Sequence, residues 1–108
     1  MRLKIDTNDV RFRAGGDAKA KKVKGEDART PDGRLIWSLR LTAYDMGLNS
    51  SETIWVEVAG DEPKLTTDDL VEVHGLVYAP WVNRDGKIVR SFRAEQITPL
   101  DSATRKAA

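Results

Sequence analysis

Residues 35–60 read LIWSLRLTAYDMGLNSSETIWVEVAG, and this stretch decides the expected fold. Apolar residues occupy every second position in its first ten residues, and the alternation returns in the segment IWVEV. A period of two is typical of a β-strand, because successive side chains point to opposite faces of a sheet. The stretch therefore predicts strands over 35–44 and 52–60, joined by a short hairpin loop at 45–51.

The same alternation recurs on both sides of this hairpin and predicts an all-β protein. Three further strands are expected, at 9–16, 70–80 and 87–98. Residues 1–5 could extend the first of them across a bend. The connection 17–34 is a polar loop with a turn signal in Pro31-Asp32-Gly33, and the connection 61–69 has room for about one helical turn.

Five short strands would form a small sheet with two unpaired edges. Such a sheet usually closes into a barrel, which buries its inner face and pairs the edges. Glycines inside the strand patterns suit the bulges that a small barrel needs. We therefore expect one domain over 1–99, a five-stranded Greek-key barrel of the oligonucleotide/oligosaccharide-binding (OB) type, and a flexible tail at 100–108. An SH3-like barrel is the alternative.

Composition excludes several classes of protein. The chain has 108 residues, enough for one domain with one modest core. It has no cysteine and a single histidine, His74, which falls on the polar side of its strand. No apolar run approaches the roughly 18 residues of a membrane span. We expect a cytoplasmic protein that is not an enzyme and uses no metal, cofactor, membrane or small-molecule substrate.

The net charge of +1 conceals an uneven distribution. Residues 1–34 contain ten Lys or Arg and six Asp or Glu, residues 35–75 contain two and eight, and residues 76–108 contain six and three. Two basic segments therefore flank an acidic one. If they meet in the fold, they form a basic surface, which is the electrostatic footprint of a nucleic-acid-binding protein.

Two of the three tryptophans are candidates for ligand contact. Trp37 is in phase with the leucines of its strand and is expected in the core. Trp55 is out of phase with the apolar residues around it and is expected to point outward. Trp81 follows a proline and precedes the turn at 83–86. Exposed tryptophans either pack against a partner subunit or stack on bases, and stacking is worth about 1–3 kcal/mol per base.

Basic residues accompany both of these tryptophans. The candidates for contact with phosphate are Arg40, Arg84, Lys87, Arg90 and Arg93, with Lys19, Lys21, Lys22 and Lys24 as an outer rim. Aromatic residues interleaved with cations are typical of a groove for a single strand. A solvated surface of mixed charge is the simpler interpretation. Glu57, on the same face as Trp55, is the residue that suits phosphate binding least.

Three segments of the chain follow one another in order: TPDGRLIWSLRLTAYD, ETIWVEVAG and LVEVHGLVYAPWVNRDGKIVRSFRAEQI. They resemble, in turn, the second strand, the third strand, and the fourth and fifth strands of the single-stranded DNA-binding protein (SSB) family. The resemblance covers residues 30–98 and implies an OB barrel that binds single-stranded DNA. It assigns base stacking to Trp55 and Trp81, and it implies a homo-oligomer, either a dimer or a tetramer.

The chain also departs from this family. Connection 61–69 leaves minimal room for the family's helix between the third and fourth strands, and the sequence ends in RKAA without the acidic tail. We expect a shortened, non-enzymatic binder of single-stranded DNA with little sequence preference, in replication, recombination or maintenance of a phage or plasmid. RNA and oligosaccharide are alternative ligands. The alternative function is a protein-interaction module within a replication, conjugation or virion complex.

Overall fold

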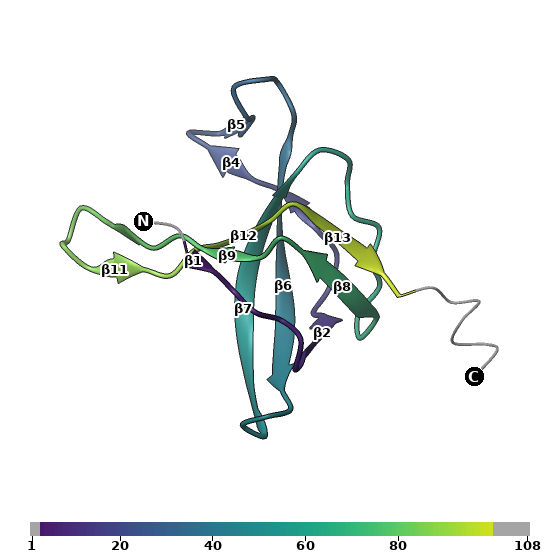
Figure 1. The fold of residues 1–108 in the computed structure, drawn as a ribbon. Helices are drawn as coiled ribbons and strands as arrows, with labels where there is room; N and C mark the ends of the chain where they lie inside the picture. The colour runs from purple at the N-terminus through teal and green to yellow at the C-terminus, as the bar shows by residue number, and fades with distance from the viewer. Residues whose placement is uncertain (1–2, 101–108) are drawn as a thin grey trace.

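The computed structural model describes residues 3–100, which form an all-β fold without a helix (Figure 1). Within these residues nine strands build one mixed sheet, and four more build two separate two-stranded hairpins. The all-β prediction is confirmed. Residues 3–100 contain no helix that is long and apolar enough to cross a membrane. Apart from Leu100, the tail expected at 100–108 lies outside the described residues.

The centre of the sheet is the predicted hairpin. Its strands are β6 (Ile36–Asp45) and β7 (Ser50–Ala59). Their antiparallel register runs without interruption from Ile36 opposite Ala59 to Asp45 opposite Ser50. Both predicted strands are confirmed. The loop between them is shorter than predicted, because the pairing continues to the last residue of β6.

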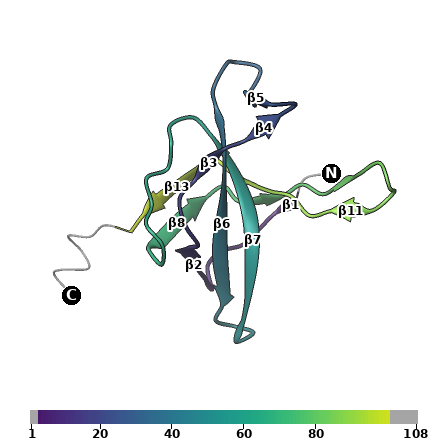
Figure 2. The same cartoon turned by 180° about the vertical axis from the view of Figure 1, so that it is seen from behind.

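Shorter strands flank this hairpin on both sides (Figures 1 and 2). On one side, β2 (Val10–Ala14) pairs antiparallel with β6, and β8 (Leu70–His74) pairs antiparallel with β2. On the other side, β12 (Phe92–Ala94) is parallel to β7 and antiparallel to β9 (Val77–Tyr78). β13 (Gln96–Pro99) pairs antiparallel with β8. Each of the five predicted strand regions therefore contains strand.

Two of the predicted strands are divided. The strand expected at 70–80 is interrupted at Gly75, whose φ of +66° is a left-handed conformation that favours glycine. A Cβ at Gly75 would lie 2.7 Å from Glu95 Cδ, so glycine also permits the close approach of the final strand. The strand expected at 87–98 is divided into β11 (Ile88–Val89), β12 and β13. Glu95 alone separates β12 from β13, and its backbone N–H donates to His74 O.

The N-terminal segment forms a strand across a bend from β2, as the sequence predicts. This strand, β1 (Leu3–Lys4), pairs antiparallel with β9, which places Leu3 opposite Tyr78, and it does not share the partners of β2. A turn separates β1 from β2, and within it the backbone N–H of Asn8 donates to Asp6 Oδ1 at 2.9 Å. An aspartate that bonds the backbone two residues ahead is a typical turn former.

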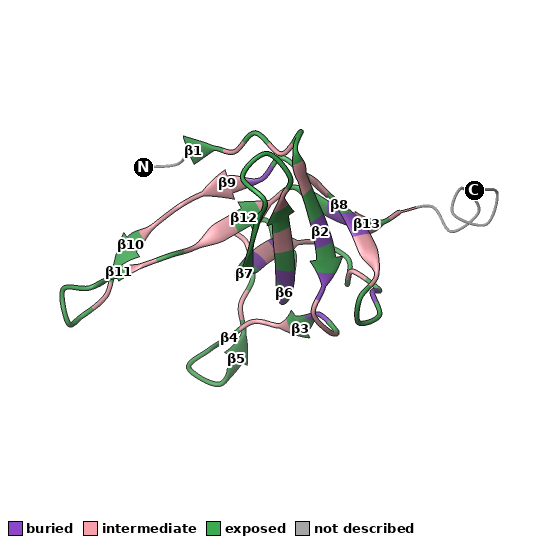
Figure 3. Cartoon of the chain, turned by 90° about the horizontal axis from the view of Figure 1, so that it is seen from below, coloured by how far each residue is buried: buried purple, intermediate pink, exposed green. Residues whose placement is uncertain are grey.

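The connection 17–34 is more structured than predicted. β3 (Lys19–Ala20) pairs with β6, and β4 (Lys22–Val23) forms a hairpin with β5 (Glu26–Asp27). The β4–β5 hairpin projects from the body of the fold (Figures 1 and 3). Lysines of this connection therefore lie on or beside short β-strands rather than in an irregular loop.

The connection 61–69 contains no helical turn. Thr66 instead closes a tight turn, because its backbone N–H and its Oγ1 hydroxyl both donate to Asp69 Oδ2, at 2.9 and 2.7 Å. Leu65, immediately before this turn, is buried against the core. The expectation of minimal helix in this connection is met without any helical turn, and Leu65 still contributes to the core.

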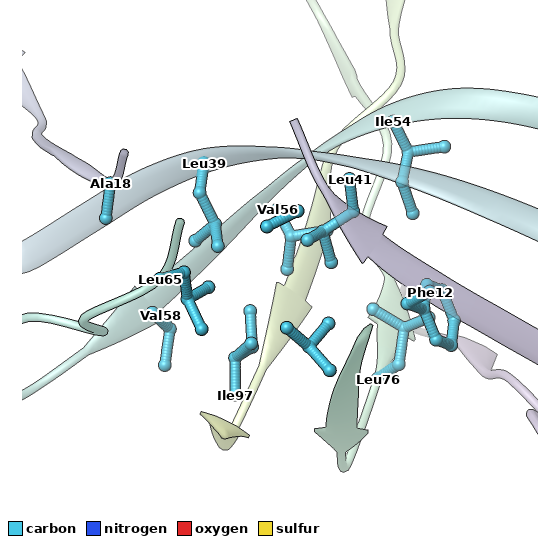
Figure 4. Packing of buried hydrophobic residues seen from close by; sticks show 12 residues of the cluster. Phe12, Ala18, Leu39, Leu41, Ile54, Val56, Val58, Leu65, Leu76 and Ile97 are labelled. Carbon is cyan, nitrogen blue, oxygen red and sulfur yellow. The ribbon is translucent and has the colours of Figure 1, made fainter. Parts of the chain in front are cut away.

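The core lies between the central hairpin and the flanking strands (Figure 4). Leu39, Leu41 and Val56 are completely buried. Buried and exposed segments alternate along β2 and β6 (Figure 3). Trp37 is partly buried against the core, and its Nε1 donates to Gly60 O at 2.9 Å. Trp37 therefore packs against the core, as expected, but it lies at the edge of the core and is only partly buried.

Candidate nucleic-acid interface

Trp55 and Trp81 line the same surface groove, which we call the tryptophan groove and which has a volume of about 480 Å³. The full lining consists of Lys21, Ser38, Trp55, Glu57, Trp81, Val89, Arg90, Ser91 and Arg93. Trp55 is 59% exposed and Trp81 is 53% exposed. Two large aromatic side chains are thus held partly open to solvent on one surface, from strands distant in the sequence.

Strand geometry sets the direction of Trp55. Its neighbours Ile54 and Val56 are buried, and successive side chains in a strand point to opposite faces. The indole must therefore face outward, as the alternation predicts. Glu57 lies two residues further along β7 and shares this outer face.

Trp81 belongs to a hairpin between β9 and β12. β10 (Trp81–Val82) pairs with β11, and Trp81 lies opposite Val89. The turn is closed by Asn83, whose Oδ1 accepts from the backbone N–H groups of Asp85 and Lys87. The hairpin extends well beyond the main sheet (Figure 1). Trp81 lies at its base, nearest the body of the protein.

Three cations line the groove with the tryptophans. Arg93 is directly opposite Glu57 in the parallel pairing of β12 with β7. Arg90 forms an ion pair with Glu52, and its guanidinium carbon lies 5.6 Å from the centre of the Phe92 ring. The hydrogen bond that the Arg90 guanidinium donates to the Glu52 carboxylate raises the pKa of Arg90 above its ordinary value. Both contacts hold the Arg90 side chain in place beside the groove.

Glu57 is neutralised by its surroundings. Lys21 Nζ lies 2.6 Å from Glu57 Oε2, and Arg93 Nε lies 4.0 Å from Glu57 Oε1. The glutamate side chain is only 18% exposed. Together Lys21, Glu57 and Arg93 carry a net positive charge, so the carboxylate does not by itself make this end of the groove repel phosphate.

Arg40 lies beside the groove without lining it. It is the cross-strand partner of Trp55 in the pairing of β6 with β7. Its Nη2 donates to Gly15 O at 2.9 Å, and a Cβ at Gly15 would lie 2.9 Å from Arg40 Nε. The absence of a side chain at Gly15 therefore lets the Arg40 side chain approach the backbone immediately after β2.

The remaining predicted cations do not line the groove. Arg84 and Lys87 belong to the β10–β11 turn, Lys19 is on β3, and Lys22 and Lys24 are on the β4–β5 hairpin. Lys22 forms an ion pair with Asp27, and this hydrogen bond lowers the pKa of the Asp27 carboxyl. Of the predicted site residues, the structure therefore brings Trp55, Trp81, Lys21, Arg90 and Arg93 into one groove.

Sequence reasoning missed the small residues of this site. Ser38 lies opposite Glu57 in the register of β6 and β7, and Ser91 lies between two lining arginines. The alternation of β6 could have identified Ser38, because Ser38 is two residues before Arg40 and therefore points to the same outward face. Short side chains at these two positions occupy little of the groove that they line.

No protein-family model matches the chain, and no curated protein has significant sequence similarity to it. Among residues 3–100, no group of three or more His, Cys, Asp or Glu side chains is placed to hold a metal ion. His74 is exposed on β8, with its Nε2 3.3 Å from Glu72.

Proposed function

We propose that this protein binds single-stranded DNA without catalysing a reaction and with little preference for sequence. The observation that carries the proposal is that Trp55 and Trp81 line one groove together with Lys21, Arg90 and Arg93. Indole rings stack on any base, because every base has a flat face, and cations along the groove neutralise phosphates. A groove with both features is suited to a flexible single strand whose bases are unpaired.

The proposed scaffold is the five-stranded OB barrel. Segment 92–99 pairs with β7 through β12 and with β8 through β13. Since β8 pairs with β2, β2 with β6 and β6 with β7, both ends of this row of strands pair with segment 92–99, which supports a barrel as the proposed scaffold. In OB barrels the second and third strands and the loops after the first and fourth strands bind oligonucleotides. The corresponding elements here contribute Trp55, Lys21 and Trp81.

The resemblance of residues 30–98 to the SSB family supports the same ligand. In that interpretation the protein is a shortened family member acting in replication, recombination or maintenance of a mobile element. RNA carries the same phosphates and bases, so it is the closest competitor for the groove.

A fluorescence titration tests the proposal. Oligo-dT is expected to quench tryptophan emission, and the affinity is expected to fall steeply as salt increases, because binding releases counterions. Duplex DNA of the same length should compete weakly, since its bases are already stacked. A folded protein whose emission is unchanged by oligo-dT at low salt would contradict the proposal. Oligo-rU in the same assay measures the preference between DNA and RNA.

One observation favours the alternative function, an assembly module. Val82 and Ile88 are cross-strand partners on the β10–β11 hairpin and are 64% and 71% exposed. Adjacent side chains alternate between faces, so this apolar pair lies on the hairpin face opposite Trp81. Paired exposed apolar residues are typical of contacts between subunits. The same pair would serve the homo-oligomer, a dimer or a tetramer, that we propose for the DNA-binding protein.

Trp55→Ala separates the two functions. If the groove binds DNA, this variant loses affinity for oligo-dT and keeps the oligomeric state of the wild-type protein. If Trp55 is buried between subunits, the variant dissociates. Sedimentation velocity and oligonucleotide anisotropy, measured on the same sample, distinguish these outcomes.

A further inference from the structure

A second groove lies on the outer face of β2 and β6, and we call it the tyrosine groove. Its volume is about 430 Å³. The full lining consists of Arg11, Arg13, Thr42, Tyr44, Met46, Ser51 and Leu70. Two arginines and one aromatic residue thus share a concave surface. The described lining residues include no carboxylate, whereas the tryptophan groove contains Glu57.

The strand register explains why these side chains meet. Arg11 lies opposite Tyr44 in the pairing of β2 with β6, and Arg13 lies opposite Thr42. On the other edge of β6, Tyr44 lies opposite Ser51 of β7. Cross-strand partners project from the same face and are close neighbours. The aromatic ring is therefore flanked by a cation on one side and a small hydroxyl on the other.

The side chains are available for a ligand. Tyr44 is 40% exposed, and its hydroxyl donates to Asn49 Oδ1, which fixes the ring without covering it. Arg13 Nη1 donates to Asp68 O at 3.1 Å and keeps its remaining donors. The Arg11 guanidinium forms no side-chain hydrogen bond or ion pair with any residue in the described part of the chain. Both guanidinium groups are thus free to contact phosphate.

The two grooves lie on one continuous face. Arg40 is the cross-strand partner of Trp55, and Tyr44 is four residues further along β6 on the same side. At about 3.3 Å per residue, these two rows of side chains are about 13 Å apart. Arg13 lies beside Thr42, in the row between them. A cation is therefore present in each row from Trp55 to Tyr44.

We propose that the tyrosine groove is a second subsite for the same single strand. The strand would leave the tryptophan groove, cross Arg40 and stack a base on Tyr44, with Arg11 and Arg13 on its phosphates. This inference rests on the proposed function. It adds that the DNA must be long enough to span both grooves before Tyr44 contributes to affinity. It also adds that the surface covered by the DNA extends onto β2.

The test compares two lengths of oligo-dT by fluorescence anisotropy. The two rows are about 13 Å apart, so a strand of about 2 nucleotides stays within one groove, whereas one of about 12 spans both, within the range of site sizes for OB folds. Tyr44→Leu should weaken binding of the longer strand about tenfold, the loss of one stacked base, and leave the shorter strand unaffected. Tyr44→Phe keeps the ring and should bind both strands as the wild-type protein does.

Arg11→Gln provides a second, independent variant. Arg11 is exposed, so its substitution should not perturb folding. For the longer strand the salt dependence, log K against log salt, should become shallower by about 0.7, the loss of one phosphate contact. Lys64→Gln removes the same charge from an exposed position outside both grooves and should leave the slope unchanged.

The outcomes distinguish this inference from the proposed function. If Tyr44→Leu and Arg11→Gln bind both strands as the wild type does, while Trp55→Ala weakens both, the second subsite is refuted and DNA binding stands. If Tyr44→Leu weakens both strands equally in a folded protein, the subsite is not length-dependent and the inference is also refuted. If the wild-type protein binds neither strand, the proposed function fails, and this inference fails with it.

Discussion

Lys21 Nζ lies 2.6 Å from Glu57 Oε2, so the carboxylate in the groove of the two exposed tryptophans is held by a lysine from connection 17–34. Arg93 approaches the same carboxylate from the other side, at 4.0 Å. Glu57 thus competes with any incoming phosphate for both cations. A bound strand would have to share or replace these contacts.

We therefore predict that Glu57→Gln binds single-stranded DNA more tightly than the wild-type protein. The substitution keeps the shape of the side chain and releases Lys21 and Arg93 for phosphate contact. The affinity at low salt should rise severalfold, and the salt dependence should steepen by about 0.7 for each added phosphate contact. Anisotropy titrations at several salt concentrations measure both quantities. Glu62→Gln, at an exposed position outside the groove, is the matched control and should change neither. Weaker binding by Glu57→Gln would instead mean that the ion pair positions Lys21 for the ligand.

Trp55→Ala and Trp81→Ala should each weaken binding by about 1–3 kcal/mol, roughly 5- to 150-fold. Both side chains are more than half exposed, so the free energy of unfolding should change little. Titration calorimetry and urea unfolding of the same samples measure the two effects separately.

Trp37 supplies the control for this pair. Trp37→Phe removes the hydrogen bond from Nε1 to Gly60 O and should lower the free energy of unfolding by about 1 kcal/mol, while affinity stays unchanged. Quenching by oligo-dT should persist in Trp37→Phe and disappear when both groove tryptophans are replaced. Strong quenching that survives the double replacement would assign the ligand to another surface.

Sequence periodicity predicts burial within a strand, because it depends only on local backbone geometry. Trp55 and Val56 are adjacent, yet one is 59% exposed and the other completely buried, as their phases require. Periodicity does not predict which strands meet. Trp81 reaches the groove of Trp55 because β12 pairs parallel with β7, and that pairing joins segments distant in the chain. The sequence predicts that the two tryptophans share a face of the protein. Only the structure shows that they line one groove.

The β4–β5 hairpin was missed for a different reason. Its turn residues Lys24 and Gly25 have φ of +52° and +82°, which is the type I′ pattern. Asn-Gly and Asp-Gly are the usual signals for this turn, since lysine seldom adopts positive φ. Without that signal the connection was predicted as an irregular loop. The neutralisation of Glu57 by Lys21 was missed with it, because Lys21 lies between β3 and this hairpin.

The core predicts a large difference between two leucines of the central hairpin. Leu39 is completely buried, whereas Leu48, in the loop after β6, is 77% exposed. Leu39→Ala should lower the free energy of unfolding by about 2–5 kcal/mol, because it leaves a cavity among packed side chains. Leu48→Ala should stay within about 0.5 kcal/mol of the wild-type value. Urea unfolding measures both, and similar losses for the two variants would contradict the arrangement of the core.

The contact between Gly75 and Glu95 gives the last prediction. Gly75 has φ of +66°, and a Cβ there would lie 2.7 Å from both Cγ and Cδ of Glu95. Gly75→Ala should therefore destabilise the fold by about 1–2 kcal/mol through the left-handed backbone, with a further loss from the side-chain overlap. Adding Glu95→Ala removes only the overlap, so the double variant should recover part of the loss. If the double variant recovers the full free energy of unfolding, the left-handed backbone carries no cost. If Gly75→Ala alone is as stable as the wild-type protein, the close contact between Gly75 and Glu95 is contradicted.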